Sequence, residues 1–166
     1  MGLTDSVFLG VGATAIVDLW SIIRSHVVGV ALPNYGLVGR WLAHLAHGHF
    51  RHSSIVASPT VRNERAIGWI AHYLIGTLFA ALLLGLCGSE WMQRPTIGPA
   101  LAVGFGTVLA PFLIMQPGMG AGIAASRTPR PAAARLHSFV THGVFGIGLY
   151  ITGLVVRSIE GLLSIV

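Results

Sequence analysis

Ionisable and amide side chains within apolar segments are the part of this sequence that could do chemistry. Asp18, His72 and His142 each interrupt a long apolar stretch, while Gln116 ends one such stretch and His137 begins another. At about 1.5 Å per helical residue, Asp18, His72 and His142 fall at a similar depth, roughly 10 Å from the nearest flanking arginine. We therefore expect all five side chains to form a polar layer in one half of a helical bundle.

This polar layer is compatible with three functions. A carboxylate in a bilayer costs several kcal/mol unless it is paired, protonated or hydrated, so we expect Asp18 to face the bundle interior with an imidazole as its partner. In the first hypothesis, His72 and His142 ligate haem b axially, or they hold a transition metal together with Asp18. In the second, the layer is the proton or substrate pathway of a small transporter or permease subunit. In the third, it stabilises the bundle as a structural element or receives a partner membrane subunit.

A second group of histidines is His44, His47, His49 and His52, which follow one another closely in the sequence. His44 and His47 share one helical face, and a glycine between the first and second pairs lets the chain fold back. The group is therefore a weaker candidate metal site. Because Arg51 lies among these histidines, contact with lipid phosphates at a membrane surface is the alternative.

The composition indicates an integral membrane protein. Hydrophobic residues make up 54% of the 166 residues, charged residues only 9%, and the mean hydropathy is +0.77. A soluble domain carries roughly 25% charged residues. The formal charge of +5 comes from arginines between the apolar stretches, so we expect no binding of nucleic acid. A single cysteine, Cys87, excludes an intramolecular disulfide framework and a cysteine-based metal site.

Four apolar stretches have the length, about 17–25 residues, that a helix needs to cross a lipid bilayer. Only helices and closed barrels satisfy the backbone in lipid, and alternating strand patterns are absent. We therefore predict an all-α, polytopic membrane protein, a bundle of four transmembrane helices in a single domain over residues 1–166. The predicted spans cover residues 7–23, 66–86, 97–115 and 136–156.

A further helix is predicted in the long connection between the first two spans. Asn34 can cap a helix that runs from Tyr35 to about Gly48, and an apolar stripe that includes Leu37 and Trp41 follows one of its faces. Such a helix either lies in the headgroup plane as a cytoplasmic interfacial helix or packs against the ends of the spans.

The distribution of the arginines predicts the orientation in the membrane. Arg94 and Arg157 lie on one side, and the other eight lie in the connections that follow the first and third spans. Because cytoplasmic connections are rich in arginine and lysine, we expect both termini to be periplasmic. The eight are Arg24, Arg40, Arg51, Arg62, Arg65, Arg127, Arg130 and Arg135.

The two halves of the sequence show a weak internal repeat. His72 follows Arg65 by seven residues, and His142 follows Arg135 by seven residues. Corresponding spans run in the same direction, so the pattern predicts a parallel duplication with the two histidines at the same depth. Glycines in the fourth span are spaced for close helix contact, either within the chain or in a homo-oligomer.

Several short strings carry a resemblance to a known family. They are NYGLVGRW at 34–41, GHFRH at 48–52, ERAIGWIAHY at 64–73, APF at 110–112 and AASRTP at 124–129. On these motifs, most of the chain resembles an uncharacterised family of short bacterial inner-membrane proteins, described only as a domain of unknown function. The resemblance implies four transmembrane helices and a bacterial inner membrane. It supplies no activity and no catalytic residue.

Overall fold

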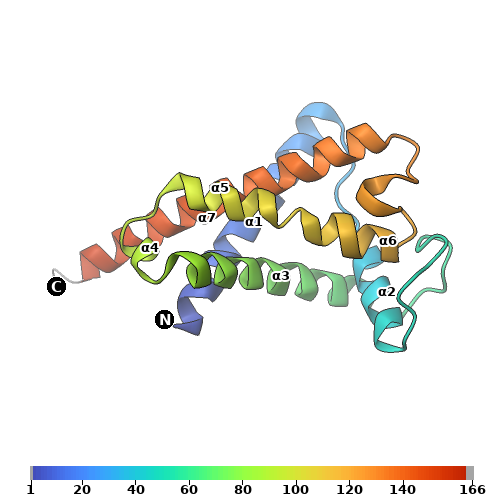
Figure 1. Ribbon diagram of the computed structural model, residues 1–166, viewed down its shortest axis with the longest axis horizontal. Coiled ribbons are helices and arrows are strands. Elements are labelled where there is room, and N and C mark those ends of the chain that lie inside the picture. The colour runs from blue at the N-terminus through green and yellow to red at the C-terminus, as the bar shows by residue number, and fades with distance from the viewer. Residues whose placement is uncertain (1, 164–166) are drawn as a thin grey trace. The chain divides into compact units, whose positions relative to one another are not determined.

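The computed structural model describes residues 2–163, and this part of the chain folds into helices without a strand (Figure 1). Four helices are long and apolar enough to cross a membrane, which confirms the predicted all-α fold with four candidate spans. They are Leu3–Val28, Glu64–Cys87, Ile97–Gly118 and Pro131–Leu163. The first and fourth of these helices extend beyond the predicted spans. Hydropathy marks only the apolar part of a helix, whereas the backbone hydrogen bonds of a helix can continue into polar residues.

The helices follow one another along the chain with one long connection, between α2 and α3. The bounds are α1 Leu3–Val28, α2 Tyr35–Ala46, α3 Glu64–Cys87, α4 Glu90–Gln93, α5 Ile97–Gly106, η1 Pro111–Met115, α6 Gln116–Gly118, η2 Ile123–Ala125 and α7 Pro131–Leu163. The helix predicted between the first two spans is present as α2. Asn34 caps it, because its side chain accepts a hydrogen bond from the backbone N–H of Gly36 at 3.1 Å.

The third candidate span is interrupted by a π-helical turn, η1. Proline has no N–H and cannot donate to the preceding turn. Within η1, the N–H of Gln116 donates to the carbonyl of Pro111, five residues earlier. An i→i−5 bond of this kind widens the turn by one residue, and such turns inside longer helices are frequent at functional sites.

The chain divides into two compact units that share its long helices. Unit 1 comprises Met1–Ala31, Tyr73–Gly106 and Thr141–Val166, and unit 2 comprises Leu32–His72 and Thr107–Val140. The single domain predicted from the sequence stays a prediction.

Unit 1 contains the apolar core of the helical bundle. Small residues let its helices approach closely, since an added Cβ on Gly10 would overlap the backbone of Thr77, and one on Gly104 would overlap the backbone of Gly146. Gly148 packs against the backbone of Ala13 in the same way. The glycines of the fourth span thus serve contacts within the chain. The core is formed by Leu9, Ala13, Val17, Ala80, Leu83, Leu84, Trp91, Met92, Ala100, Val103, Phe145 and Leu149.

Unit 2 joins α2 to the start of α3. An added Cβ on Gly39 would overlap the carbonyl oxygen of Glu64, and one on Gly68 would overlap the carbonyl oxygen of Tyr35. The two helices therefore touch backbone to backbone, as expected for the alternative in which α2 packs against a span. The connection after α2 is tied to α6, because the N–H of His52 donates to the carbonyl of Gly118 at 2.9 Å.

Candidate functional site

Asp18 is hydrogen-bonded to a tyrosine in unit 1. The Tyr73 hydroxyl donates to Oδ2 of Asp18 at 2.9 Å, and both side chains are half-buried. The sequence suggested an imidazole as the partner of this carboxylate, and the tyrosine was not foreseen. The only signal in the sequence was the position of this tyrosine in an apolar stretch, directly after His72.

The contact between Asp18 and Tyr73 is positioned by small residues one turn away on each helix. Thr14 lies four residues before Asp18 on α1, and Gly76 lies three residues after Tyr73 on α3, so each pair shares a helical face. An added Cβ on Gly76 would overlap the hydroxyl of Thr14. Thr14 is 1% exposed, and its hydroxyl has no hydrogen-bond partner within the described residues. The α1–α3 contact therefore holds two polar groups, a carboxylate and a buried hydroxyl, one turn apart.

His72 packs into an aromatic cluster in unit 2. Its ring stacks on Tyr35 with 4.1 Å between ring centroids and 24° between planes, and it meets Trp69 edge-on at 5.9 Å. Tyr35 is the first residue of α2 and also contacts Trp69, at 4.7 Å. The imidazole thus helps to dock α2 on α3.

His142 lies in unit 1 in a mostly apolar setting. Its ring hydrogen-bonds the backbone of Gly104 and lies 6.4 Å from the ring of Phe79. His72 and His142, the two proposed haem ligands, therefore each contact residues of their own unit.

The remaining members of the predicted polar layer belong to unit 2. Gln116 donates weakly to the Ser138 hydroxyl, with 3.4 Å between Nε2 and Oγ, while its Oε1 has no partner within residues 2–163. His137 is half-buried on α7. The contact between Gln116 and Ser138 was not foreseen from the sequence.

The four clustered histidines separate into two kinds. His44 and His52 stack on each other, with 2.8 Å between Nδ1 of His44 and Nε2 of His52, and Nδ1 of His52 lies 3.1 Å from the carbonyl oxygen of Gly118. A carbonyl can only accept, so His52 donates to Gly118, and the neutral ring then accepts from His44. His47 and His49 are exposed.

A metal site is not assembled within the part of the chain that the structure describes. No group of three or more histidine, cysteine, aspartate or glutamate side chains gathers there closely enough to hold an ion. The haem and metal hypotheses therefore stay predictions, with His72, His142 and Asp18 as their proposed ligands.

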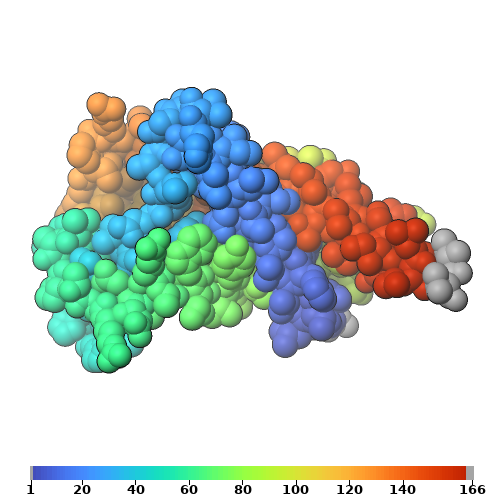
Figure 2. Space-filling view, turned by 180° about the vertical axis from the view of Figure 1, so that it is seen from behind, coloured from blue at the N-terminus to red at the C-terminus, as the bar shows by residue number. Residues whose placement is uncertain are grey.

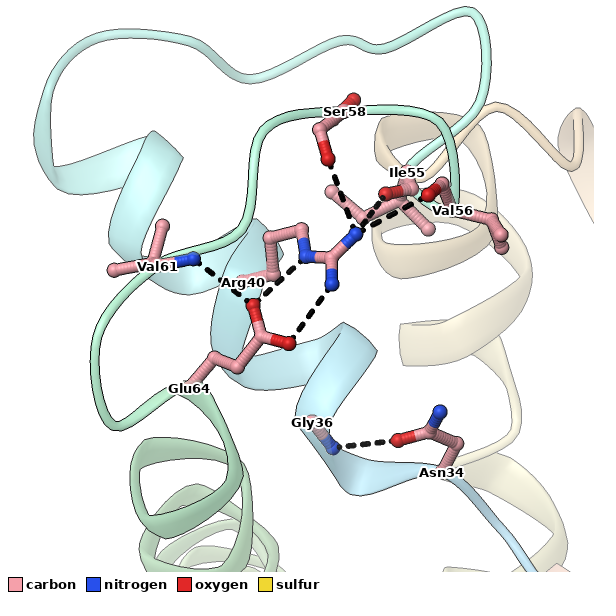
Figure 3. Close-up of polar contacts among 8 residues, drawn as sticks. All are labelled: Asn34, Gly36, Arg40, Ile55, Val56, Ser58, Val61 and Glu64. Carbon is pink, nitrogen blue, oxygen red and sulfur yellow. Dashed lines mark hydrogen bonds and ion pairs between the residues drawn. The ribbon is translucent and has the colours of Figure 1, made fainter.

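The strongest polar arrangement of unit 2 is a clamp formed by Arg40 and Glu64 (Figure 3). The guanidinium donates to both carboxylate oxygens at 2.8 Å, and the backbone N–H of Val61 donates to Oε2 at 3.1 Å. Hydrogen bonding to this carboxylate raises the pKa of Arg40 above its ordinary value. The pair therefore connects α2 to the first turn of α3 through a bidentate, charge-assisted contact.

Arg40 also binds the connection between the two helices. Its Nη1 donates to the carbonyl oxygens of Ile55, Val56 and Ser58 at 3.1–3.2 Å (Figure 3). The residue is only 7% exposed. Sequence reasoning missed this clamp. The available signal was that Glu64 is the one acidic residue between Asp18 and Glu90.

The family comparison matches nearly all of the described chain. The model of DUF2938, a protein family of unknown function, aligns with residues 7–156. The chain belongs to the DUF2938 family. The match covers all four candidate spans except residues 3–6 of the first and 157–163 of the fourth, and it confirms the resemblance found in the sequence motifs. No curated protein and no solved structure matches this DUF2938 chain.

Proposed function

We propose that this DUF2938 protein is a small proton-coupled transporter or permease subunit in which Asp18 and Tyr73 form the proton-carrying pair. The observation that carries the proposal is the hydrogen bond between them, 2.9 Å long, between two candidate membrane spans. Ionisable side chains within spans are costly and mark ion or substrate pathways in many membrane proteins.

The chemistry of the pair suits a group that gains and loses a proton. When Asp18 is ionised, the Tyr73 hydroxyl donates to it, as in the structure. When Asp18 is protonated, it becomes a donor, and the hydroxyl oxygen can accept instead. The same two side chains therefore satisfy each other in both protonation states, whereas a guanidinium partner would favour only the ionised state.

The hydroxyl of Thr14 supports a continuing pathway. It is buried one helical turn from Asp18 and has no hydrogen-bond partner within the described residues. A buried polar group without a partner costs about 1–3 kcal/mol, and a water or a passing solute would remove this cost. A chain of Asp18, such a water and Thr14 would extend along the α1–α3 contact.

Proton flux in proteoliposomes tests the proposal. Purified protein is reconstituted into vesicles that contain a pH-sensitive dye, and a potassium diffusion potential drives proton entry. Asp18→Asn should reduce the protein-dependent flux to the level of empty vesicles, and Tyr73→Phe should slow it. The matched control is Glu160→Gln, which also removes one carboxylate but lies exposed near the end of α7.

The outcomes separate function from folding. Monodisperse elution in detergent shows that each variant is folded, and Tyr73→Phe, which removes only the hydroxyl, serves if Asp18→Asn does not fold. Flux through Asp18→Asn equal to that through the unaltered protein would overturn the proposal. The structural and cofactor hypotheses would then remain.

The proposed location is a bacterial inner membrane with both termini in the periplasm. The support is the gathering of eight of the ten arginines in the two connections after the first and third spans. Alkaline phosphatase fused after the last residue should then be active in cells, and green fluorescent protein at the same position should be dark. The opposite pattern would reverse the orientation.

A further inference from the structure

Unit 2 presents arginines that no acidic residue balances. Its two segments contain a single acidic residue, Glu64, and the clamp with Arg40 already engages that carboxylate. The remaining arginines are all exposed, and we call them the arginine surface. They are Arg51, Arg62, Arg65, Arg127, Arg130 and Arg135. Figure 2 shows the segments that carry them, cyan to green for residues 48–65 and orange for residues 127–135, at the surface.

Two members of the arginine surface stand at the start of candidate membrane spans. Arg65 is the second residue of α3, and Arg135 is in the first turns of α7. Where an apolar span begins, the chain passes from the hydrocarbon into the headgroup layer. We therefore expect these guanidinium groups at the depth of lipid phosphates.

Each of these arginines is followed, four residues later and on the same helical face, by an exposed aromatic side chain, and an exposed aliphatic side chain comes directly after it. Trp69, four residues after Arg65, is 39% exposed, and Ile70 is 62% exposed. Phe139, four residues after Arg135, is 43% exposed, and the neighbouring Val140 is 38% exposed. Residues four apart lie one above the other along a helix. Each helix thus offers a cation above an apolar strip, which matches the phosphate and acyl chain of one lipid.

We infer that the arginine surface binds anionic phospholipid headgroups, with Arg65 and Arg135 contacting phosphate while Trp69 and Phe139 contact the acyl chains. A nucleic acid or an acidic soluble protein would also meet positive charge, but it would leave the exposed apolar side chains beside these arginines uncovered. Arginine suits the role because its planar, always charged fork binds phosphate oxygens in a bidentate manner. The inference does not depend on proton transport by Asp18.

Thermal unfolding of the full chain in dodecyl maltoside, with added phosphatidylglycerol or phosphatidylcholine, tests the inference. Phosphatidylglycerol should raise the melting temperature at a lower concentration than phosphatidylcholine does. Each arginine near an anionic surface contributes roughly fivefold in affinity. Arg62→Gln/Arg65→Gln should therefore raise the half-effective concentration of phosphatidylglycerol roughly 30-fold.

The matched control is Arg94→Gln/Arg157→Gln. It removes the same number of charges from exposed arginines that lie outside unit 2, so its response to phosphatidylglycerol should equal that of the unaltered protein. If both double variants respond alike, net charge governs binding and the inference is wrong. If Arg62→Gln/Arg65→Gln does not fold without lipid, Arg130→Gln/Arg135→Gln takes its place.

Two further probes identify the ligand. Glycerol phosphate, which carries the phosphate without acyl chains, should leave the melting temperature unchanged at concentrations at which phosphatidylglycerol acts. Equal stabilisation by glycerol phosphate would assign the surface to a free phosphate compound and overturn the lipid inference. Equal stabilisation by phosphatidylcholine and phosphatidylglycerol would show that the arginines do not select the lipid, and it would overturn the inference as well.

Discussion

The backbone contact between α2 and α3 makes a sharp prediction about Gly68. A methyl group added at this position would overlap the carbonyl oxygen and carbon of Tyr35, which are backbone atoms and cannot rotate away. Gly68→Ala should therefore push the start of α2 away from α3. The Arg40–Glu64 clamp and the stacking of Tyr35 on His72 join the same two helices, so we expect both to weaken.

The magnitude can be worked out against a control on the same helix. Gly85 also lies in α3, and nothing lies within 4 Å of a Cβ added there. Alanine is favoured over glycine in a helix by about 1 kcal/mol, and this gain applies at both positions. Overpacking at Gly68 costs about 1–3 kcal/mol more. The free energy of unfolding of Gly68→Ala should therefore lie about 1–3 kcal/mol below that of Gly85→Ala.

Thermal unfolding in a single detergent measures this difference. For a chain of this size, 1 kcal/mol corresponds to roughly 2–4 °C in melting temperature, so Gly68→Ala should melt several degrees below Gly85→Ala. The melting temperature of the unaltered protein should lie between those of the two variants or close to that of Gly68→Ala. Equal melting temperatures for the two variants would refute the close approach of α2 and α3.

Three other predictions concern polar groups. Arg40→Gln and Glu64→Gln should each lower the melting temperature. The double variant should lower it by less than the sum of the two single decreases, because the two side chains bind each other. Additive decreases would contradict the clamp. Tyr73→Phe should cost about 1 kcal/mol of stability through one hydrogen bond, and an unchanged melting temperature would argue against that bond. The cofactor hypothesis predicts a Soret band or stoichiometric metal in purified protein, abolished by His72→Ala/His142→Ala. A colourless, metal-free protein would contradict that hypothesis.

The sequence was sufficient to predict the candidate spans, because lipid imposes a strong requirement on each helix that depends only on its own residues. A spanning helix must be apolar over about 20 consecutive residues, so each candidate span could be found without knowing what it contacts. The helix from Tyr35 was found for a related reason, since Asn34 supplies a cap that depends only on its immediate neighbours.

The polar contacts were not predictable in this way. Arg40 lies 24 residues from Glu64, and their contact depends on the path of the connection that returns to α3. Asp18 was expected to meet an imidazole on grounds of charge, but hydrogen bonding is satisfied equally well by the Tyr73 hydroxyl. Equal depth in the membrane says nothing about the direction in which a side chain points around its helix.

The π-helical turn at Pro111–Met115 has a consequence for how this span can change in evolution. Deleting one residue from the turn would let an ordinary α-helix close and would leave the span long enough for the membrane. Because the wide turn accommodates one extra residue, the residues on either side would keep the faces that they present now. Gln116 would still face Ser138. A relative that lacks one residue here would therefore keep both its topology and the side chains that it presents to α7. By contrast, a substitution that closed the turn into an α-helix without a deletion would rotate one side by about 100° relative to the other.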